Sequence, residues 1–483
     1  MSTPTAYPTA RPSQPTPPRA PIGGLTLQLF RASVSSRTGT GTLTLLSLGS
    51  LTVGATIAFL VAGGTYMFYR RGEDANLQAR LGTSQPGMDA HTWTVLALTA
   101  CAFLVPALFS LISQAAVTSA AGRERRLAAL RLIGLSARDI SRMTVLETGI
   151  NAVVGTALGA LLSALLVPAF STLTFMGIPL SPSELYLPWW GYLAVGSALI
   201  VLALAAALAG MQRVAVSPLG VARQQMPRAL RWWRAVAFLV LAVALLVGVN
   251  QFEPSAGLGD MLAVAAFLLL LIGTLNLIAP LFLQVSAWVA GTLGSDANFV
   301  ASRRVATGAR AAWRRVSPSA LFGLLAGYMI VSPFGDDDLS QSLRENPETS
   351  IIFHDVFTGI ILTISFGFCI MAMSILQGQA HEVFANADLT RSLRLMGLRP
   401  GFLTRVATYE IFAPLITVSL LGFAWGAVIG LMMLYSAGDL EIAPRLANAG
   451  LLLGAGWLVV AVAFIAVIPL RNRVAHNATR KND

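Results

Sequence analysis

The chain contains 483 residues, of which 55% are hydrophobic and 11% are charged. Ordinary soluble domains carry about 25% charged residues, and the mean hydropathy of this chain is +0.69. Many of its apolar runs reach the ~20 residues that a helix needs to cross the hydrocarbon core of a bilayer. The composition therefore excludes an ordinary soluble protein and predicts an all-α polytopic membrane protein.

The N-terminal residues 1–22 are rich in Pro and Thr and have no apolar core, so they predict a disordered cytoplasmic tail without a signal peptide. About ten apolar runs follow, each long enough for a transmembrane helix. The predicted spans are 41–69, 92–117, 146–170, 188–211, 234–250, 261–287, 317–334, 356–378, 407–436 and 447–470.

The arginines predict the orientation of these spans, because positively charged loops stay on the cytoplasmic side. The inner loops hold the arginine clusters at 123–142, 213–231, 303–315 and 391–405, whereas the outer loops 171–187 and 251–260 have no Lys or Arg and 335–355 is acidic. Arg70, Arg71 and Arg80 fall outside and oppose the assignment. The net charge of +11 thus indicates which side of the membrane the loops occupy, and it does not predict a nucleic-acid partner. The chain is expected in the inner (plasma) membrane of the cell, with both termini in the cytoplasm.

An internal repeat organises the chain. The stretch LRLIGLSARDI at 130–140 recurs as LRLMGLRPGFL at 393–403, an offset of 263 residues. After each copy comes a helix whose glycines are spaced to let helix backbones approach closely in a bilayer. The matching pairs are Leu130/Leu393, Arg131/Arg394, Leu132/Leu395, Gly134/Gly397, Leu135/Leu398, Arg142/Arg405 and Glu147/Glu410; the packing glycines are Gly155, Gly159, Gly422, Gly426 and Gly430.

The repeat predicts the domain organisation. Four spans in 23–211 and four in 291–470 form two repeats, and two linking spans in 212–290 join them. The repeats are parallel, because the six spans between equivalent points are an even number. The remaining residues 471–483 form a basic cytoplasmic tail.

Each repeated stretch predicts a helix, a corner and a second helix at the cytoplasmic surface. An arginine at the bilayer centre costs roughly 2.5–3.5 kcal/mol, so the arginines of 123–142 cannot be buried in lipid. Gly134 and Gly397 can take the left-handed conformation that ends a helix. The second helix restarts with a capping-box pattern at Ser136 or with Pro400.

The glutamate after each corner has no helical partner in reach. Glu147 lies five residues after Arg142, and Glu410 lies five residues after Arg405, whereas pairs on one helix face are three or four apart. Each glutamate is therefore expected either to find a partner on another helix or another protein, or to be hydrated at the membrane interface.

The two repeated segments resemble the FtsX-like permease family, the membrane subunits of MacB-type ABC transporters. That family has a basic run, a leucine/arginine–x–x–glycine core, a second short helix, a glutamate and a glycine-rich span. The segments that match are RERRLAALRLIGLSARDISRMTVLETGINAVVGTALGALL from Arg123 and LTRSLRLMGLRPGFLTRVATYEIFAPLITVSLLGFAWGAVIG from Leu389. The ten-span layout also resembles the permeases of antimicrobial-peptide resistance systems.

This resemblance implies that both corners are coupling helices for cytoplasmic ABC ATPase subunits, two per permease, which would bind ATP and Mg. The outer loops of about 20 residues leave no room for a MacB-type stalk or a large outer domain, which favours an amphipathic peptide or lipid-like substrate taken from membrane lipid. The coupling positions it implies are Arg126, Leu130, Arg131, Gly134, Leu135, Arg142, Glu147, Leu393, Arg394, Gly397, Leu398, Arg405 and Glu410.

The sequence gives little support for an enzymatic function. A P-loop needs G-x-x-x-x-G-K-[ST], but the only lysine is Lys481, with no glycines before it; the histidines have no metal-ligand spacing.

A secondary transporter would need ionisable residues at the centres of spans, where essentially none is found. A non-transporting relay to an envelope enzyme or sensor would need an outer docking surface. The acidic residues Asp336, Asp337 and Asp338 form either an attracting site for cationic peptides or a solvated turn.

Overall fold

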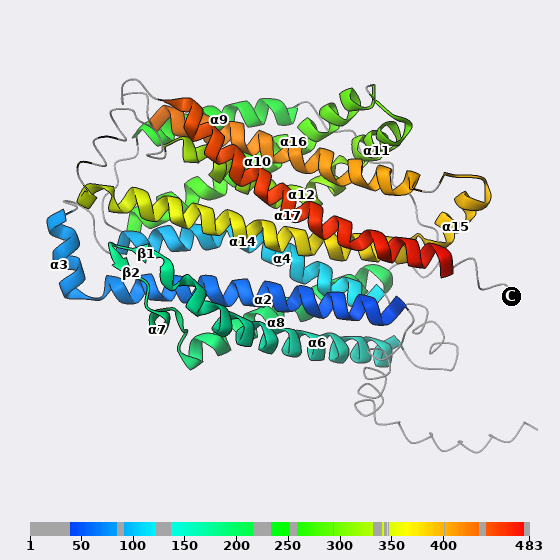
Figure 1. The fold of residues 1–483 in the computed structure, drawn as a ribbon, viewed down its shortest axis with the longest axis horizontal. Coiled ribbons are helices and arrows are strands. Elements are labelled where there is room, and N and C mark those ends of the chain that lie inside the picture. Colours follow the sequence, from blue (N-terminus) through cyan, green and yellow to red (C-terminus); the bar gives the residue numbers. More distant parts are fainter. Residues whose placement is uncertain are drawn as a thin grey trace, which may run out of the picture.

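The protein is described by a computed structural model, in which the long helices lie side by side along one direction (Figure 1). Figure 1 shows α3, α7 and the hairpin β1–β2 at one end of this bundle, called here the hairpin end, and α15 at the other, called the corner end. The described residues are 39–84, 91–121, 137–215, 233–251, 258–292, 294–331, 341, 345, 347–399, 401–433 and 441–477.

In chain order, four long helices precede a middle segment and four follow it, and these sets are called here the first group, the linking segment and the second group. The first group is α2 (Gly39–Gly72), α4 (His91–Ala121), α6 (Ala137–Leu166) and α8 (Trp189–Ala215). The linking segment is α9 (Trp233–Gln251), α10 (Leu258–Ala290) and α11 (Asp296–Thr307). The second group is α12 (Ala309–Tyr328), α14 (Pro347–Ala385), α16 (Phe402–Met433) and α17 (Ile442–Asn477).

The short elements lie mostly between long helices. They are α3 (Ala75–Ser84), η1 (Val167–Thr172), β1 (Thr174–Phe175), β2 (Ile178–Pro179), α7 (Pro182–Leu185), η2 (Met329–Val331) and α15 (Ala387–Leu395). Of these, α3, α7 and the hairpin were not expected from the sequence.

The prediction of an all-α multi-pass membrane protein is confirmed at this level. Eight helices among the described residues are long and apolar enough to cross a membrane: α2, α4, α6, α8, α10, α14, α16 and α17. The other two predicted spans coincide with α9, whose described apolar part is the shorter segment Trp233–Ala244, and with α12, which carries Arg310, Arg314 and Arg315 in its first two turns.

The two groups use corresponding helix contacts. In the first group α2 packs on α4 and α6, and α4 packs on α8; in the second group α12 packs on α14 and α16, and α14 packs on α17. The groups meet mainly where α14 contacts α4 and α2. The main apolar core lies mostly in the second group and extends to α2, α4 and α10. Within it the fully buried Phe322 and Phe368 contact each other with ring centroids 5.4 Å apart.

Glycines allow the closest helix pairs to form. A Cβ at Gly155 would lie 2.7 Å from the Cβ of Leu51, and one at Gly159 would lie 2.5 Å from the Cβ of Ala55. Contacts between α12 and α16 are tighter still. A Cβ at Gly422 or Gly426 would lie 2.0 Å from the carbonyl oxygen of Ala320 or Leu324. Backbones this close require residues without side chains at the crossing.

The hairpin end is organised by a two-residue turn. Phe175 pairs with Ile178, and the turn residues Met176 and Gly177 both have positive φ, 59° and 70°. Two central residues with φ > 0 match the right-handed twist of short hairpins. Methionine pays a steric cost in this conformation, and the Met176 side chain is buried in compensation.

Buried charges tie the hairpin to the helices beneath it. Arg71 is 7% exposed; its Nε donates to Glu184 Oε2 (2.8 Å) and its Nη1 donates to the carbonyl of Phe175 (2.8 Å). Asp355 of α14 is also buried and accepts from Trp93 Nε1 of α4 (2.8 Å) and from the amide of Met176 (2.7 Å). Arg71, which opposed the charge-based orientation in the sequence, thus has a structural role that accounts for its position.

Candidate functional site

The second repeated stretch forms a defined corner between α15 and α16. The amide of Gly397 donates to the carbonyl of Arg394 (2.9 Å), and the amide of Leu398 donates to the carbonyl of Leu393 (3.1 Å). This pair of bonds is the Schellman arrangement that closes a helix. Gly397 has φ +91°, and a Cβ there would meet nothing within 4 Å. The backbone conformation, and not a lack of space, therefore requires glycine.

The restart of the chain after the corner uses a second glycine. Gly401 has φ +83°, its carbonyl accepts from the amide of Arg405 (3.0 Å), and α16 begins at Phe402. Pro400, which the sequence placed in the first turn, lies outside the described residues. Helix, corner and helix are thus built by local backbone chemistry.

The corner presents apolar side chains to its surroundings. Leu395 is 80% exposed, Met396 is 75% exposed and Leu389 is 55% exposed. Leu389 and Met396 are seven residues apart, so they lie on the same side of the chain as α15 ends. These three residues are called here the corner surface. Outside a bilayer, large apolar side chains exposed near one another are typical of an interaction site.

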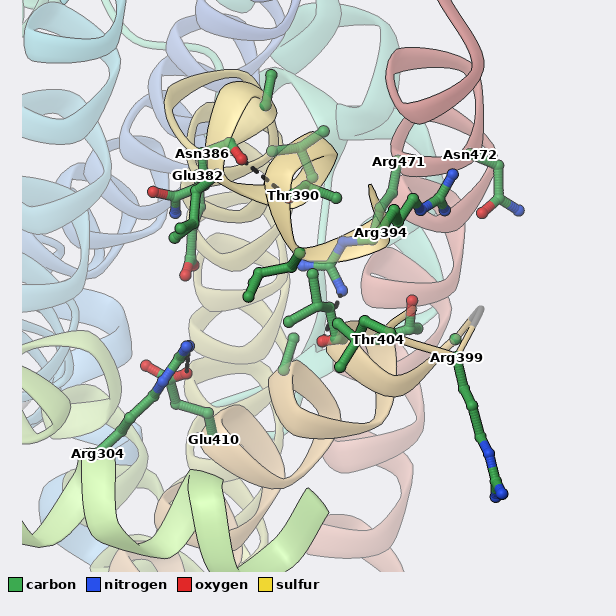
Figure 2. Close-up of a pocket in the computed structure, with 18 residues that line it drawn as sticks. Arg304, Glu382, Asn386, Thr390, Arg394, Arg399, Thr404, Glu410, Arg471 and Asn472 are labelled. Carbon is green, nitrogen blue, oxygen red and sulfur yellow. Dashed lines mark hydrogen bonds and ion pairs between the residues drawn. The ribbon is translucent and has the colours of Figure 1, made fainter. Parts of the chain in front are cut away.

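A pocket of about 90 Å³ lies beneath the corner. Figure 2 shows Arg304 lying against Glu410 on one side of it, whereas Arg399 extends away from it. The predicted residues that line it are Leu393, Arg394, Leu398 and Glu410, and the other polar lining residues are Arg304, Glu382, Asn386, Thr390, Arg399, Thr404, Arg471 and Asn472. Charges of both signs therefore meet where α14, α15, α16 and α17 converge.

Glu410 anchors α16 to the preceding part of the chain. Its Oε2 lies 3.5 Å from Arg304 Nη1 of α11, and its Oε1 lies 3.2 Å from Arg315 Nη1 of α12. Both arginines are about half exposed, so each pair is worth about 1 kcal/mol or less. The geometric result matters more, because one carboxylate fixes α16 against two other helices just after the corner.

Arg471 closes the pocket from α17. Its Nη1 donates to the carbonyl of Leu403 (3.2 Å) on α16, and its Nη2 donates to Gln379 Oε1 (3.5 Å) on α14. Gln379 in turn donates to Glu382 Oε2 (3.0 Å). The corner is thereby connected by side chains to three helices of the second group.

The remaining predicted positions are divided between the two corners. Arg405 is exposed near the start of α16, outside the pocket lining. On α6, Arg142 is exposed and Glu147 is buried. The residues of the first corner lie outside the described residues, as do the acidic ones: Arg126, Leu130, Arg131, Gly134, Leu135, Asp336, Asp337 and Asp338.

Three arginines of this site were not singled out from the sequence: Arg304, Arg315 and Arg471. Arg304 and Arg315 were assigned to a charged inner loop and Arg471 to the basic tail. The five-residue spacing between Arg405 and Glu410 indicated a partner elsewhere, but it could not select one arginine among several. Among the described residues, no group of three or more His, Cys, Asp or Glu is arranged to hold a metal ion.

Comparison with known proteins gives one finding for this chain. Residues 98–218 match the family described as FtsX-like permease C-terminal. The match covers most of α4, the first corner, α6, the hairpin and α8, and it ends before the second repeated stretch. A search of curated proteins finds no match to the chain.

Proposed function

We propose that this multi-pass membrane protein, with its FtsX-like permease domain at 98–218, is the permease subunit of an ABC transporter driven by a separate cytoplasmic ATPase. FtsX-like permeases are non-catalytic transmembrane components that generally work with cytoplasmic ABC ATPases. In this proposal two ATPase subunits bind one permease, one at each corner, and supply the ATP and Mg. The transported substrate is an amphipathic peptide or a lipid-like molecule.

The corner surface is the observation that carries this proposal. Leu395 and Met396 are among the most exposed large apolar side chains of the described chain, and they lie at the end of a helix closed by the Schellman arrangement at Gly397. A partner that buries these side chains gains apolar contact and moves a corner with fixed geometry. Displacement of the corner then moves α16, because α16 follows the corner directly in the chain. Glu410 passes this movement on to α11 and α12 through its ion pairs with Arg304 and Arg315.

The matching helix contacts of the two groups support a two-repeat layout with equivalent corners. α6 follows the first corner as α16 follows the second, and each packs through glycines on the first long helix of its own group. We place both corners and both termini on the cytoplasmic side of a cell inner membrane, in agreement with the arginine clusters. The hairpin end then faces outward.

The small size of the hairpin end bears on the substrate. Its described elements are α3, α7, η1 and a hairpin with two residues per strand. Such elements offer little surface for a periplasmic stalk, so we propose that the substrate enters from the membrane itself. Arg71, Glu184 and Asp355 hold these elements against the bundle.

Affinity purification of the full chain from its own membranes tests the corner surface. We expect an ABC ATPase to co-purify with the wild type and to be reduced by Leu395→Ser with Met396→Ser, because both changes remove apolar contact area. Phe299→Ser on α11 is the matched control, since Phe299 is also an exposed apolar side chain outside the corner. Equal loss in the control, or unchanged recovery with the double corner variant, would sink the proposed docking site.

A further inference from the structure

Five polar residues are buried at one level of the bundle, outside the lining of the corner pocket. Ser47 and Ser50 of α2 and Gln377 of α14 are 0% exposed, and Thr148 and Asn151 of α6 are 1% exposed. Uncharged polar side chains at helix contacts in membranes usually hydrogen-bond across to a neighbouring helix. These five residues are called here the polar layer.

Contacts between α2 and α6 place Ser47, Thr148 and Asn151 together, and Ser50 follows Ser47 by about one turn on α2. Gly155 on α6 meets Leu51 on α2, since a Cβ at Gly155 would lie 2.7 Å from the Cβ of Leu51. One turn earlier on the two helices come Asn151 and Ser47. Thr148 lies two turns before Gly155 and therefore shares its face.

Contacts of α14 bring Gln377 to the same level. A Cβ at Gly49 of α2 would lie 4.0 Å from Met373 Cε, and Gln377 follows Met373 by one turn on the same face. The next residue, Gly378, faces α4, where a Cβ would lie 3.7 Å from Gln114 Oε1. Since α14 belongs to the second group and α2, α4 and α6 to the first, the polar layer lies where the two groups meet.

Several polar atoms of the layer lack hydrogen-bond partners among the described residues. They are Ser50 Oγ, Thr148 Oγ1 and both amide atoms of Gln377, Oε1 and Nε2. Ser47 differs, because its Oγ donates to the carbonyl of Ala115 (2.9 Å). Buried polar groups in folded proteins are almost always paired. Ser50, Thr148 and Gln377 thus carry buried polar atoms without a partner in the part of the chain that the structure describes, which indicates that these three side chains make their hydrogen bonds to something else.

We propose that the polar layer is a binding site for the uncharged hydrogen-bonding part of the substrate, reached when the two groups of helices separate. This inference rests on the proposed transport function and specifies its substrate class. Hydroxyl and amide side chains both donate and accept, so they suit hydroxyl and amide groups of a ligand.

Thermal unfolding of the purified chain in detergent is the first test. Gln377→Leu, alone and together with Ser50→Ala and Thr148→Val, is expected to raise the Tm by about 2 °C or more, because unpaired buried polar groups are replaced by apolar ones. Ser47→Ala is the matched control and is expected to lower the Tm, since its hydroxyl is paired. A lower Tm for Gln377→Leu would show that the layer is a bonded part of the core and would overturn the proposal.

Thiol labelling in membrane vesicles from the native cells is the second test. Gln377→Cys, in a chain with Cys101→Ala and Cys369→Ala, is expected to react with a water-soluble maleimide faster with ATP than without it. Added dodecyl maltoside, below the concentration that dissolves the vesicles, should slow this labelling, whereas dodecane should not. A labelling rate that is the same with and without ATP, or that both additives change equally, overturns the proposal.

The two proposals fail in different ways. The Tm measurement needs the chain alone, so its result stands whether or not an ATPase is recovered at the corner surface. If no ATPase is recovered but the Tm rises as expected, the proposed coupling fails and the polar layer stands as a site. If an ATPase is recovered and the Tm falls, the coupling stands and the layer is structural.

Discussion

Gly426→Ala is expected to lower the free energy of unfolding by about 2–3 kcal/mol, because overpacking of a tight contact forces the backbone to shift. The new Cβ would lie 2.0 Å from the carbonyl oxygen of Leu324, and this oxygen belongs to the backbone of α12. The same crossing is equally tight from the other side, where a Cβ at Gly327 would lie 2.1 Å from the carbonyl oxygen of Phe423. α12 and α16 would therefore have to separate along their length.

The Gly426→Ala prediction is checked by thermal or denaturant unfolding of the purified chain in detergent. Gly454→Ala on α17 is the matched control, because a Cβ there would meet nothing within 4 Å. That control is expected to unfold like the wild type or to be more stable by up to about 1 kcal/mol, since alanine favours a helix over glycine. If both variants unfold like the wild type, α12 and α16 do not pack as described.

The second large effect is expected at the hairpin end, for Asp355→Ala. This change leaves Trp93 Nε1–H and the amide of Met176 buried without their acceptor. Each unsatisfied buried donor costs about 1–3 kcal/mol, so the variant should unfold at least about 2 kcal/mol more easily. The turn at Met176, with its positive φ of 59°, should also lose its order.

Asp355→Asn distinguishes the loss of the acceptor from the loss of the charge. The amide oxygen of asparagine can still accept the two hydrogen bonds, so this variant should keep most of the stability and the near-ultraviolet signal of Trp93. Glu73→Ala, which removes an exposed carboxylate at the same end, should leave unfolding unchanged. An Asp355→Ala chain as stable as the wild type would contradict the described contact.

The membrane class and the long helices were predictable because both depend on hydrophobicity summed over many residues. The end of α15 was predictable for a different reason, since glycine is the residue that best adopts the positive φ found at Gly397. The precise number of spans was harder to predict. In α9 the described apolar segment is short, and in α12 the apolar segment shares its helix with arginines. Hydrophobicity therefore favours a span in both helices, whereas the short length of the one and the charge of the other oppose it.

The hairpin end could not be predicted, because its order depends on residues far apart in the sequence. The strands have two residues each, which is too short to show an alternating pattern. Their supports, Arg71 and Asp355, are separated from the turn by 104 and 179 residues. A charge-based rule treats Arg71 as a topological signal, whereas its burial and its bond to Glu184 come only from the folded chain.

The site was predictable only in part for the same reason. Local spacing indicated that Glu410 pairs outside its own helix, but many arginines near the corner end could have been the partner. Packing of α11 and α12 against α16 selects Arg304 and Arg315. Exposure of Leu395 and Met396 is likewise a property of the folded corner, because leucine and methionine in a sequence rich in apolar residues give no sign of exposure.

The central claim is that each corner binds one ATPase subunit, and the mass of the intact complex tests it most directly. Native mass spectrometry of the complex extracted from its own membranes is expected to give one permease with two ATPase subunits for the wild type. Gly397→Pro should leave one ATPase subunit, because proline cannot adopt the φ of +91° found there, and Gly134→Pro with Gly397→Pro should leave none. A permease that never carries an ATPase, or one whose complex keeps its mass in all three forms, would contradict the account.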